Sequence, residues 1–282
     1  MEWLALTIIG LFGLLIGSFL NVVIVRLPRM LAHSWTAQCY EYLKQPLPIE
    51  AKEPYNLVLP RSHCPKCDHM ISAIDNIPVI SFLFLKGRCR YCQMTISWRY
   101  PLIEITTALM SIMVAYRFGL TWQTLAALIL TWSLIVLTVI DLQEQLLPDD
   151  ITLPILWLGL IVNSQSLFTS LPSALFGAIA GYLFLWSIYW LFKLLTHKEG
   201  MGYGDFKLLA MLGAWLGWQV LPAIILLSSV VGVFFGLTLI ACKRLTREQP
   251  IPFGPYLAMA GWLSLLWGDK LIQQYLTLIP SL

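Results

Sequence analysis

Long apolar runs separated by short polar connections dominate the pattern of this sequence. Eight runs have the composition of helices inside a membrane: residues 3–25, 101–118, 122–140, 151–162, 172–195, 206–218, 220–241 and 253–267. Several of them reach the length of roughly 20 residues that crosses the hydrocarbon core of a bilayer. The pattern therefore predicts an all-α polytopic membrane protein with about eight transmembrane helices.

The composition excludes a soluble globular domain. The 282 residues have a mean hydropathy of +0.75, are 58% hydrophobic and include 12 tryptophans. We therefore expect the lipid bilayer as the main surroundings of the chain, and we expect no nucleic-acid partner. The net charge of +3 carries little information by itself, because it hides an uneven distribution of the basic residues.

The basic residues are distributed unevenly between the predicted connections. Ten of the 18 Lys and Arg residues lie between Arg26 and Arg99, and only Arg117 and Lys270 fall on the opposite side. Eight crossings place the other six with the first ten: Lys193, Lys198, Lys207, Lys243, Arg244 and Arg247. Basic residues gather on the cytoplasmic side of membrane proteins, so residues 26–100 are predicted to be cytoplasmic. We expect the first apolar run to remain as an anchor.

This pattern divides the chain into three parts. Residues 1–25 form the first transmembrane helix, residues 26–100 a small cytoplasmic domain, and residues 101–282 a transmembrane core. Within the cytoplasmic part, residues 77–85 are apolar, and they fit either a buried strand or an amphipathic element that touches the membrane.

Two aspartates stand at the edges of predicted membrane helices. Asp141 closes the third apolar run, and Asp205 ends the glycine-rich segment Gly200-Met-Gly-Tyr-Gly-Asp205 just before the sixth. A charged group near the bilayer interior costs a few kcal/mol, so such residues tend to be functional. The topology puts both on the cytoplasmic side, and two carboxyl groups that share a proton are the basis of aspartic proteolysis.

Simpler roles exist for the acidic residues near these helix ends. Asp205 could cap a helix beginning at Phe206, a role that is compatible with catalysis, and capping is the favoured role for Asp149 and Asp150. Asp141 is different, because a carboxylate at the carboxyl end of a helix meets an unfavourable dipole. Glu144 is expected to be a solvated residue at the interface.

Two CxxC pairs lie in the cytoplasmic part, Cys64-Pro-Lys-Cys67 and Cys89-Arg-Tyr-Cys92. The 21 residues between them are about one residue beyond the usual spacing of a four-cysteine zinc site. Four thiolates satisfy tetrahedral zinc completely, which favours a structural rather than a catalytic metal. Disulfides are disfavoured in the cytosol, and no βαβ pattern supports a redox pair. Cys39 and Cys242 are expected to stay unpaired.

Nearly the whole chain resembles the prepilin leader peptidases, which are bifunctional membrane enzymes that process type IV pilins and type II secretion pseudopilins. The motifs that carry the resemblance are Gly17-Ser-Phe-Leu-Asn-Val-Val-Ile24, Arg26-Leu-Pro28, the two CxxC pairs, Asn76-Ile-Pro-Val79, Ile96-Ser-Trp-Arg-Tyr-Pro101, Glu104, Asp141 with Pro148-Asp149, Gly200–Lys207 and Pro252-Phe-Gly-Pro-Tyr256.

The resemblance implies a division of roles. Asp141 and Asp205 correspond to the catalytic aspartates of the family, and Cys64, Cys67, Cys89 and Cys92 to its zinc ligands. Family members remove a short basic leader at the cytoplasmic face of the bacterial inner membrane, and then methylate the new N-terminus from S-adenosylmethionine. No glycine-rich nucleotide loop in this chain supports the methyltransferase activity independently.

Two other classes of protein fit parts of the pattern. Short, interrupted membrane segments with acidic residues also describe an ion-coupled transporter, although its acids would lie near the midplane within inverted repeats. A membrane-tethered zinc-ribbon binding module would explain the basic loop but leave Asp141 and Asp205 unused.

Overall fold

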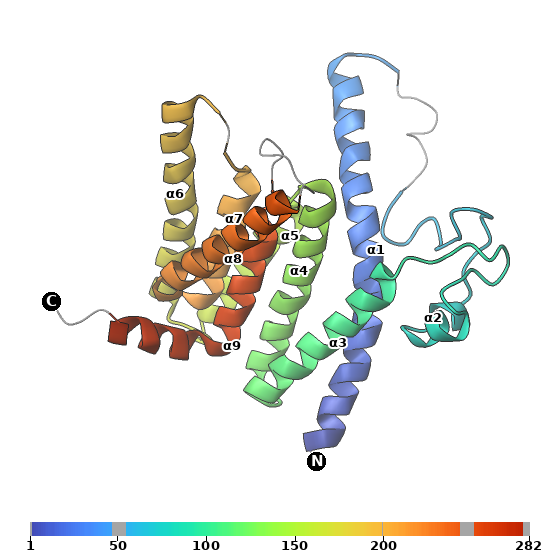
Figure 1. Ribbon diagram of the computed structural model, residues 1–282, viewed down its shortest axis with the longest axis horizontal. Helices are drawn as coiled ribbons and strands as arrows, with labels where there is room; N and C mark the ends of the chain where they lie inside the picture. The colour runs from blue at the N-terminus through green and yellow to red at the C-terminus, as the bar shows by residue number, and fades with distance from the viewer. Residues whose placement is uncertain (1, 47–54, 199, 243–250, 279–282) are drawn as a thin grey trace. The chain divides into compact units, whose positions relative to one another are not determined.

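The computed structural model describes residues 2–46, 55–198, 200–242 and 251–278, which form helices and loops without a strand. The helices are α1 (Glu2–Tyr42), η2 (Ile74–Asn76), α2 (Ile80–Phe84), α3 (Arg99–Phe118), α4 (Trp122–Glu144), α5 (Asp149–Asn163), α6 (Leu171–Thr196), α7 (Tyr203–Leu216), η3 (Trp218–Val220), α8 (Leu221–Ala241) and α9 (Gly254–Leu278). They form two compact units, residues 1–119 and 120–282 (Figure 1).

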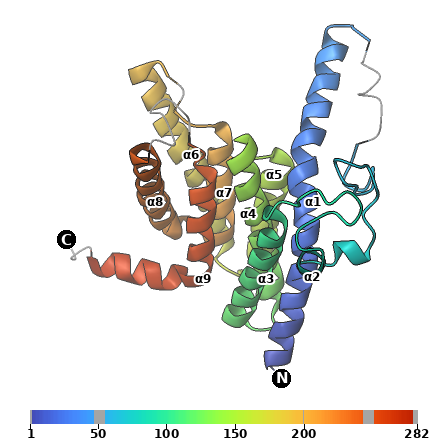
Figure 2. The same ribbon diagram turned by 45° about the vertical axis from the view of Figure 1, so that its right-hand side comes forward.

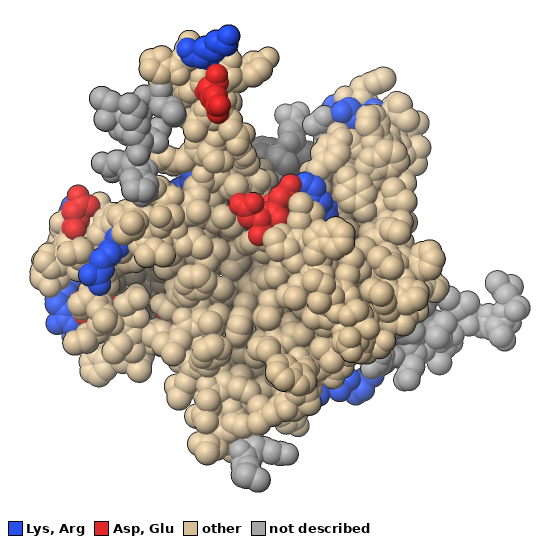
Figure 3. Space-filling model, turned by 180° about the vertical axis from the view of Figure 1, so that it is seen from behind, with Lys and Arg blue, Asp and Glu red and all other residues tan. Residues whose placement is uncertain are grey.

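The predicted all-helical membrane class is confirmed, because each of the eight apolar runs coincides with a helix. Among the described residues, five helical stretches are long and apolar enough to cross a membrane; they correspond to α1, α3, α4, α6 and α8. Helices α5 and α7 are shorter, so the number of crossings stays a prediction. Most of the surface drawn in Figure 3 carries neither basic nor acidic residues, and the charged side chains form a few separate groups.

Two boundaries differ from the prediction or refine it. The first helix does not end at Val25 but continues through Pro28 to Tyr42, which makes it 41 residues long. At the other end of the chain, α9 changes direction at Trp267, the residue at which the last apolar run was predicted to end. Three basic residues used for the orientation, Lys243, Arg244 and Arg247, lie outside the described residues.

In the first unit, α1 and α3 pack closely against each other (Figure 1). A side chain at Gly17 would place its Cβ 2.7 Å from the Cα of Glu104, so only glycine permits this approach. One turn further along α1, the buried Asn21 side chain donates to the carbonyl of Tyr100. Polar and small residues thus join two apolar helices, as is common in membranes where burial alone provides no driving force.

In the second unit, α7 is the central helix. Its side chains from Phe206 to Trp215 are buried except for Lys207, which is partly exposed, and it packs closely against α6 (Figure 2). A helix that is apolar on all sides belongs in the interior of a bundle. Gly177 of α6 and Gly213 of α7 bring their backbones into direct contact, where a Cβ on either residue would overlap the other carbonyl oxygen. This contact fixes the helix that carries Asp205.

The carboxyl end of α7 is fixed by one buried amide. The Asn163 side chain donates to the carbonyls of Ala214 and Trp215, each at 2.9 Å. Its oxygen accepts from the backbone N–H groups of Phe168 and Thr169. All four hydrogen-bonding positions of this amide are therefore used, which satisfies carbonyls that the end of α7 would otherwise leave unpaired.

Candidate active site and cysteine cluster

The structure brings Asp141 and Asp205 together although 64 residues separate them in the sequence. Asp141 lies in the last turn of α4, and Asp205 in the first turn of α7. Both are buried, with 5% and 7% of their surface exposed, and the charge of Asp141 acts on Asp205. Two buried carboxyl groups within electrostatic range of each other are an arrangement that proteins use for shared-proton chemistry.

The amino end of α9 faces Asp141. The backbone N–H of Gly254, the first residue of α9, points at the Asp141 carboxylate. The unpaired N–H groups at the start of a helix carry partial positive charge, which offsets the unfavourable position of Asp141 at the carboxyl end of α4. The residue must be glycine, because a Cβ at Gly254 would lie 2.6 Å from Oδ2 of Asp141. This Oδ2 atom is buried without a hydrogen-bond partner among the described residues, so it is an acceptor whose hydrogen-bonding capacity is unused.

Leu147 joins the surroundings of the two aspartates. A Cβ at Gly204, beside Asp205, would lie 2.8 Å from the Leu147 Cβ, and a Cβ at Gly254 would lie 3.2 Å from its Cδ1. The Leu147 side chain is buried, so it fills the space next to both glycines. The apolar side chain of Leu147 has no chemistry that marks it in the sequence, and the motif Pro252-Phe-Gly-Pro-Tyr256 marks Gly254 without indicating its contact with Asp141.

The alternative role of Asp205 as the cap of a helix beginning at Phe206 is wrong. Helix α7 begins at Tyr203 rather than Phe206, and its capping position is occupied by Gly202. Asp205 is the third residue of the helix, and its carboxylate accepts from the N–H of Gly202. This is the position from which an acidic side chain reaches back to the start of a helix, and the bond orients the carboxyl group in the site.

The predicted caps at Asp149 and Asp150 are also wrong. Pro148 occupies the capping position of α5, and both aspartates lie in the first turn. Asp149 instead pairs with Lys207 of α7, whose Nζ lies 2.7 Å from each carboxylate oxygen. The ion pair joins the amino ends of α5 and α7 two residues from Asp205, and a lysine within an apolar run is the signal that could have revealed it. Glu144 is exposed, as predicted.

The four cysteines also come together, in the first unit. Their sulfur atoms all lie within 4.8 Å of one another, and Sγ of Cys64 lies 3.6 Å from Sγ of Cys92. A disulfide would require a much shorter distance, and all four cysteines are free. Tetrahedral zinc with bonds of about 2.3 Å separates its sulfur ligands by about 3.8 Å, so the cluster fits a four-thiolate metal site.

Each half of the cluster is a tight local turn. The N–H of Cys64 donates to the carbonyl of His69, and the N–H of Cys89 donates to the carbonyl of Met94. Backbone N–H groups of Lys66 and Cys67 lower the pKa of the Cys64 thiol to about 6. The N–H of His69 also favours the thiolate of Cys67, but burial and the neighbouring sulfurs raise its pKa to about 12. A bound cation would favour the thiolate of Cys67, because a nearby positive charge lowers the pKa of a coordinating thiol.

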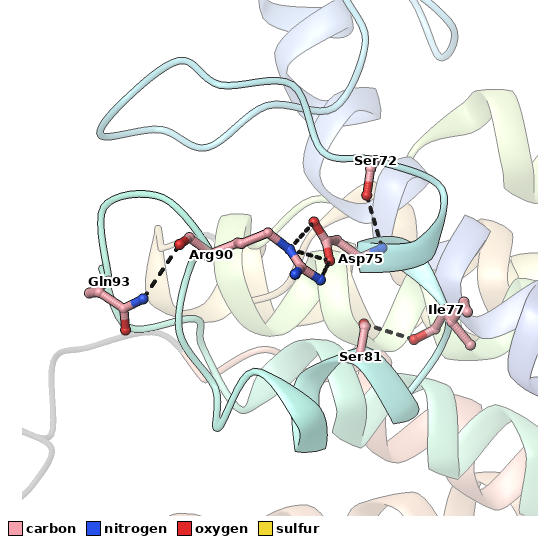
Figure 4. A network of polar contacts seen from close by, with 6 residues as sticks. All are labelled: Ser72, Asp75, Ile77, Ser81, Arg90 and Gln93. Atoms are coloured by element: carbon pink, nitrogen blue, oxygen red, sulfur yellow. Dashed lines mark hydrogen bonds and ion pairs between the residues drawn. The ribbon is translucent and has the colours of Figure 1, made fainter.

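A polar network links the second cysteine turn to the segment around helix η2, which lies between the two turns in the sequence. The Arg90 guanidinium donates to both carboxylate oxygens of Asp75, with the Nη2–Oδ1 distance at 2.5 Å, and Ser72 accepts from the N–H of Asp75 (Figure 4). Residues 77–85, for which a buried strand was one alternative, instead form the short helix α2 and its flanks. The strand alternative is wrong. Cys39 and Cys242 are exposed and unpaired, as predicted.

The comparisons with known proteins agree across the chain. Residues 11–118 match the bacterial peptidase A24 N-terminal domain, and residues 128–237 match the type IV leader peptidase family. A protein named "Prepilin leader peptidase/N-methyltransferase" from Aeromonas hydrophila is 58% identical, and the match covers 98% of this chain and 96% of that relative. A protein of the same name from Stutzerimonas stutzeri is 59% identical, and the match covers 94% of this chain and 91% of the relative. The Pseudomonas aeruginosa relative is 57% identical over 94% and 91%. No solved structure matches, and nothing in these comparisons supports a transporter.

Proposed function

Because this chain belongs to the type IV leader peptidase family, we propose that it is a membrane aspartic endopeptidase of prepilins and pseudopilins. It removes the short basic leader from these substrates and then methylates the new N-terminal residue with S-adenosylmethionine. The enzyme is an integral membrane protein. We place it in the bacterial inner membrane, with cleavage on the cytoplasmic side, from the distribution of its basic residues.

One observation supports the peptidase activity most directly. Asp141 and Asp205 are both buried, interact electrostatically, and reach the same place from helices that are far apart in the sequence. Burying carboxyl groups is costly, and a buried pair with a specific charge partner is a candidate for catalysis. The packing around it is specific as well, because Gly254 and Gly204 leave room that larger residues would fill.

The proposed mechanism needs one ionised and one protonated carboxyl group. The ionised member accepts a proton from water, while the protonated member donates a hydrogen bond to the scissile carbonyl and polarises it. Water then attacks the carbonyl carbon, and the proton returns to the leaving amine. Two coupled carboxyls titrate as a pair, so the pair as a whole, rather than either residue alone, holds the shared proton.

The remaining parts have supporting roles in this proposal. Cys64, Cys67, Cys89 and Cys92 hold one structural zinc ion, which stabilises a small domain with little core of its own. Residues 1–25 act as an anchor helix, residues 26–100 as the zinc domain and residues 101–282 as the protease core. S-adenosylmethionine supplies an electrophilic methyl group to the free amine of the cleaved pilin.

A cleavage assay tests the first half of this proposal. Purified enzyme in detergent is incubated with a peptide that has a basic leader, a glycine and a hydrophobic helix beginning with phenylalanine. We expect a single cut after the glycine, detected by mass spectrometry. Intact peptide after incubation with correctly folded enzyme would refute the peptidase assignment.

A second assay separates cleavage from methyl transfer. The double variant Asp141→Asn/Asp205→Asn is given labelled S-adenosylmethionine and an already cleaved pilin with a free N-terminal phenylalanine. We expect the double variant to transfer methyl groups as wild type does, because this chemistry does not require the two carboxyls. Transfer by wild type alone would mean that both reactions share one site, and transfer by neither would leave the enzyme a peptidase only.

A further inference from the structure

An exposed apolar surface surrounds the short helix α2. Five large apolar side chains, which we call the apolar ledge, are between 41% and 84% exposed: Ile74, Ile77, Ile80, Leu83 and Phe84. Residues three and four apart share one face of a helix, so Ile80, Leu83 and Phe84 project together. Phe82 on the other side is buried and packs edge-to-face on Trp98, which attaches α2 to the domain. Exposed large apolar side chains that are gathered in one short segment usually contact a membrane or another protein.

A buried hydrogen bond sets the depth of this ledge. Val79, the residue before α2, donates its backbone N–H to Oε2 of Glu104 at 2.7 Å. Glu104 belongs to α3, a candidate membrane span that begins at Arg99, and five residues of helix rise by about 7.5 Å. The backbone just before α2 is therefore tied to the second turn of a candidate membrane helix, roughly 7 Å along its axis from Arg99, so α2 lies beside the first turns of α3.

The contacts of Glu104 make this depth a fixed property of the fold. The Glu104 side chain is 7% exposed, and it also accepts from the hydroxyl of Ser18 on α1. Gly17 of α1 packs against the Cα of Glu104, so α1 and α3 are in close contact at the residue that holds Val79. Val79 itself has a φ of +59°, a conformation that a β-branched residue adopts only when its surroundings impose it. The hydrogen bond to Glu104 thus holds the Val79 backbone in a strained conformation.

Charged and aromatic residues beside the ledge fit a lipid surface. Lys86 and Arg88 follow α2 directly and are exposed, where they can meet the negative charge of phospholipid headgroups. Trp98, at the start of α3, is 74% exposed, and tryptophan is enriched at the boundary between headgroups and acyl chains. The apolar ledge thus has exposed basic residues and an exposed tryptophan close to it in the sequence, which is the combination of side chains that a lipid surface favours.

From this geometry we propose that the apolar ledge inserts into the nearer membrane leaflet, on the side of the small domain that carries the four cysteines (the cysteine domain). The lipid bilayer covers Ile80, Leu83 and Phe84, and the Val79–Glu104 hydrogen bond holds the ledge at its depth. The small domain is thereby attached to the membrane along one surface and does not extend freely into water. This inference concerns lipid contact and is independent of the proposed peptidase activity.

Photo-crosslinking of the full-length enzyme in phospholipid vesicles tests this proposal. The aromatic crosslinker p-benzoylphenylalanine replaces Phe84 in one sample, Phe19 of the apolar part of α1 in a second, and Tyr42 in a third. Each is an exposed aromatic position, at 84%, 51% and 88%, so the replacements are matched in size, and Tyr42 also matches Phe84 in exposure. After irradiation, mass spectrometry measures the fraction of protein that carries the mass of one lipid.

We expect lipid adducts at Phe84 in a yield comparable to Phe19, and a loss of adduct at Tyr42, which lies 17 residues beyond the predicted end of the span in α1. The same replacement at Leu83 provides a second position if the first disturbs folding, which zinc content reports. Phe84 and Leu83 that behave like Tyr42 would overturn the proposal. Crosslinks to an added pilin in place of lipid would also overturn it and identify the ledge as a protein-docking surface.

Discussion

The cysteine cluster of the first unit is built from short local turns, whereas the aspartate pair of the second unit is built from helices that are far apart in the sequence. Each half of the cluster is a turn of six residues closed by its own backbone hydrogen bonds, as between Cys64 and His69. The aspartate site needs α4, α7 and α9 together, because Asp141, Asp205 and Gly254 come from three separate helices. We infer that the cluster depends mainly on a metal ion, whereas the aspartate site depends on close packing between helices.

The largest expected effect tests the metal dependence of the first unit. Replacing Cys64 with serine should remove zinc and unfold residues 55–98, because structural zinc contributes on the order of 10 kcal/mol of folding free energy in small domains. Metal analysis and limited proteolysis measure both changes. Cys39→Ser is the control and should keep its zinc, since Cys39 lies outside the cluster. A Cys64→Ser/Cys89→Ser variant that resists proteases like wild type would contradict the assignment.

The next largest effect concerns the two carboxyls of the second unit. Asp141→Asn or Asp205→Asn should reduce the cleavage rate by a factor of about 10² to 10⁴, because each swap keeps the shape and removes the ionisable proton. Rates are measured with a prepilin-like peptide at saturating concentration. Asp150→Asn serves as the control, because Asp150 is an exposed residue in the first turn of α5. Near-normal turnover in either test variant would refute the catalytic pair.

Helix packing in the second unit provides the third test. Gly213→Ala puts a Cβ onto the Gly177 carbonyl and should destabilise the helical core by about 1–3 kcal/mol, with a matching loss of cleavage and unchanged zinc content. The melting temperature in detergent measures the destabilisation. In the control Gly268→Ala the new Cβ would meet only a Val220 methyl at 3.8 Å, so this variant should melt no lower than wild type. Equal melting of both variants would show that the close approach is unnecessary.

A smaller effect is expected from the ion pair beside Asp205. Lys207→Met should slow cleavage only a few-fold, because a partly exposed pair contributes roughly 0.2–1 kcal/mol. The reversed pair Asp149→Lys/Lys207→Asp should recover part of the lost rate if the pair orients α7. A loss in Lys207→Met as large as that in Asp205→Asn would instead assign Lys207 a direct part in the chemistry.

The smallest effect is a pH dependence confined to the first unit. Hydrogen bonds from Arg90 lower the pKa of Asp75, so their contribution to stability is present above the ordinary pKa of an aspartate and lost as the pH falls through the lowered value. Asp75→Asn should therefore make the cysteine domain more protease-sensitive at neutral pH and reduce the additional sensitivity gained on acidification. An unchanged acid response in Asp75→Asn would contradict this role.

Much of this protein is determined by the local sequence. Apolar runs of membrane length mark the helices, since water and lipid sort side chains by polarity wherever the helix goes. The spacing of Cys64, Cys67, Cys89 and Cys92 marks the cluster, because each CxxC pair forms its own turn. The position of Asp141 and Asp205 at the ends of apolar runs marks them as candidates, because a charge at that depth is costly.

Only the tertiary structure decided which groups surround these residues. The capping roles predicted for Asp149 and Asp150, and the capping alternative for Asp205, are wrong, because α5 and α7 begin at other residues than expected. A distant lysine pairs with Asp149 instead. Neither the approach of Gly254 to Asp141 nor the bond from Val79 to Glu104 leaves a signal in the sequence. Hydropathy and motif spacing describe neighbours along the chain, whereas contacts between helices depend on how all of them pack at once.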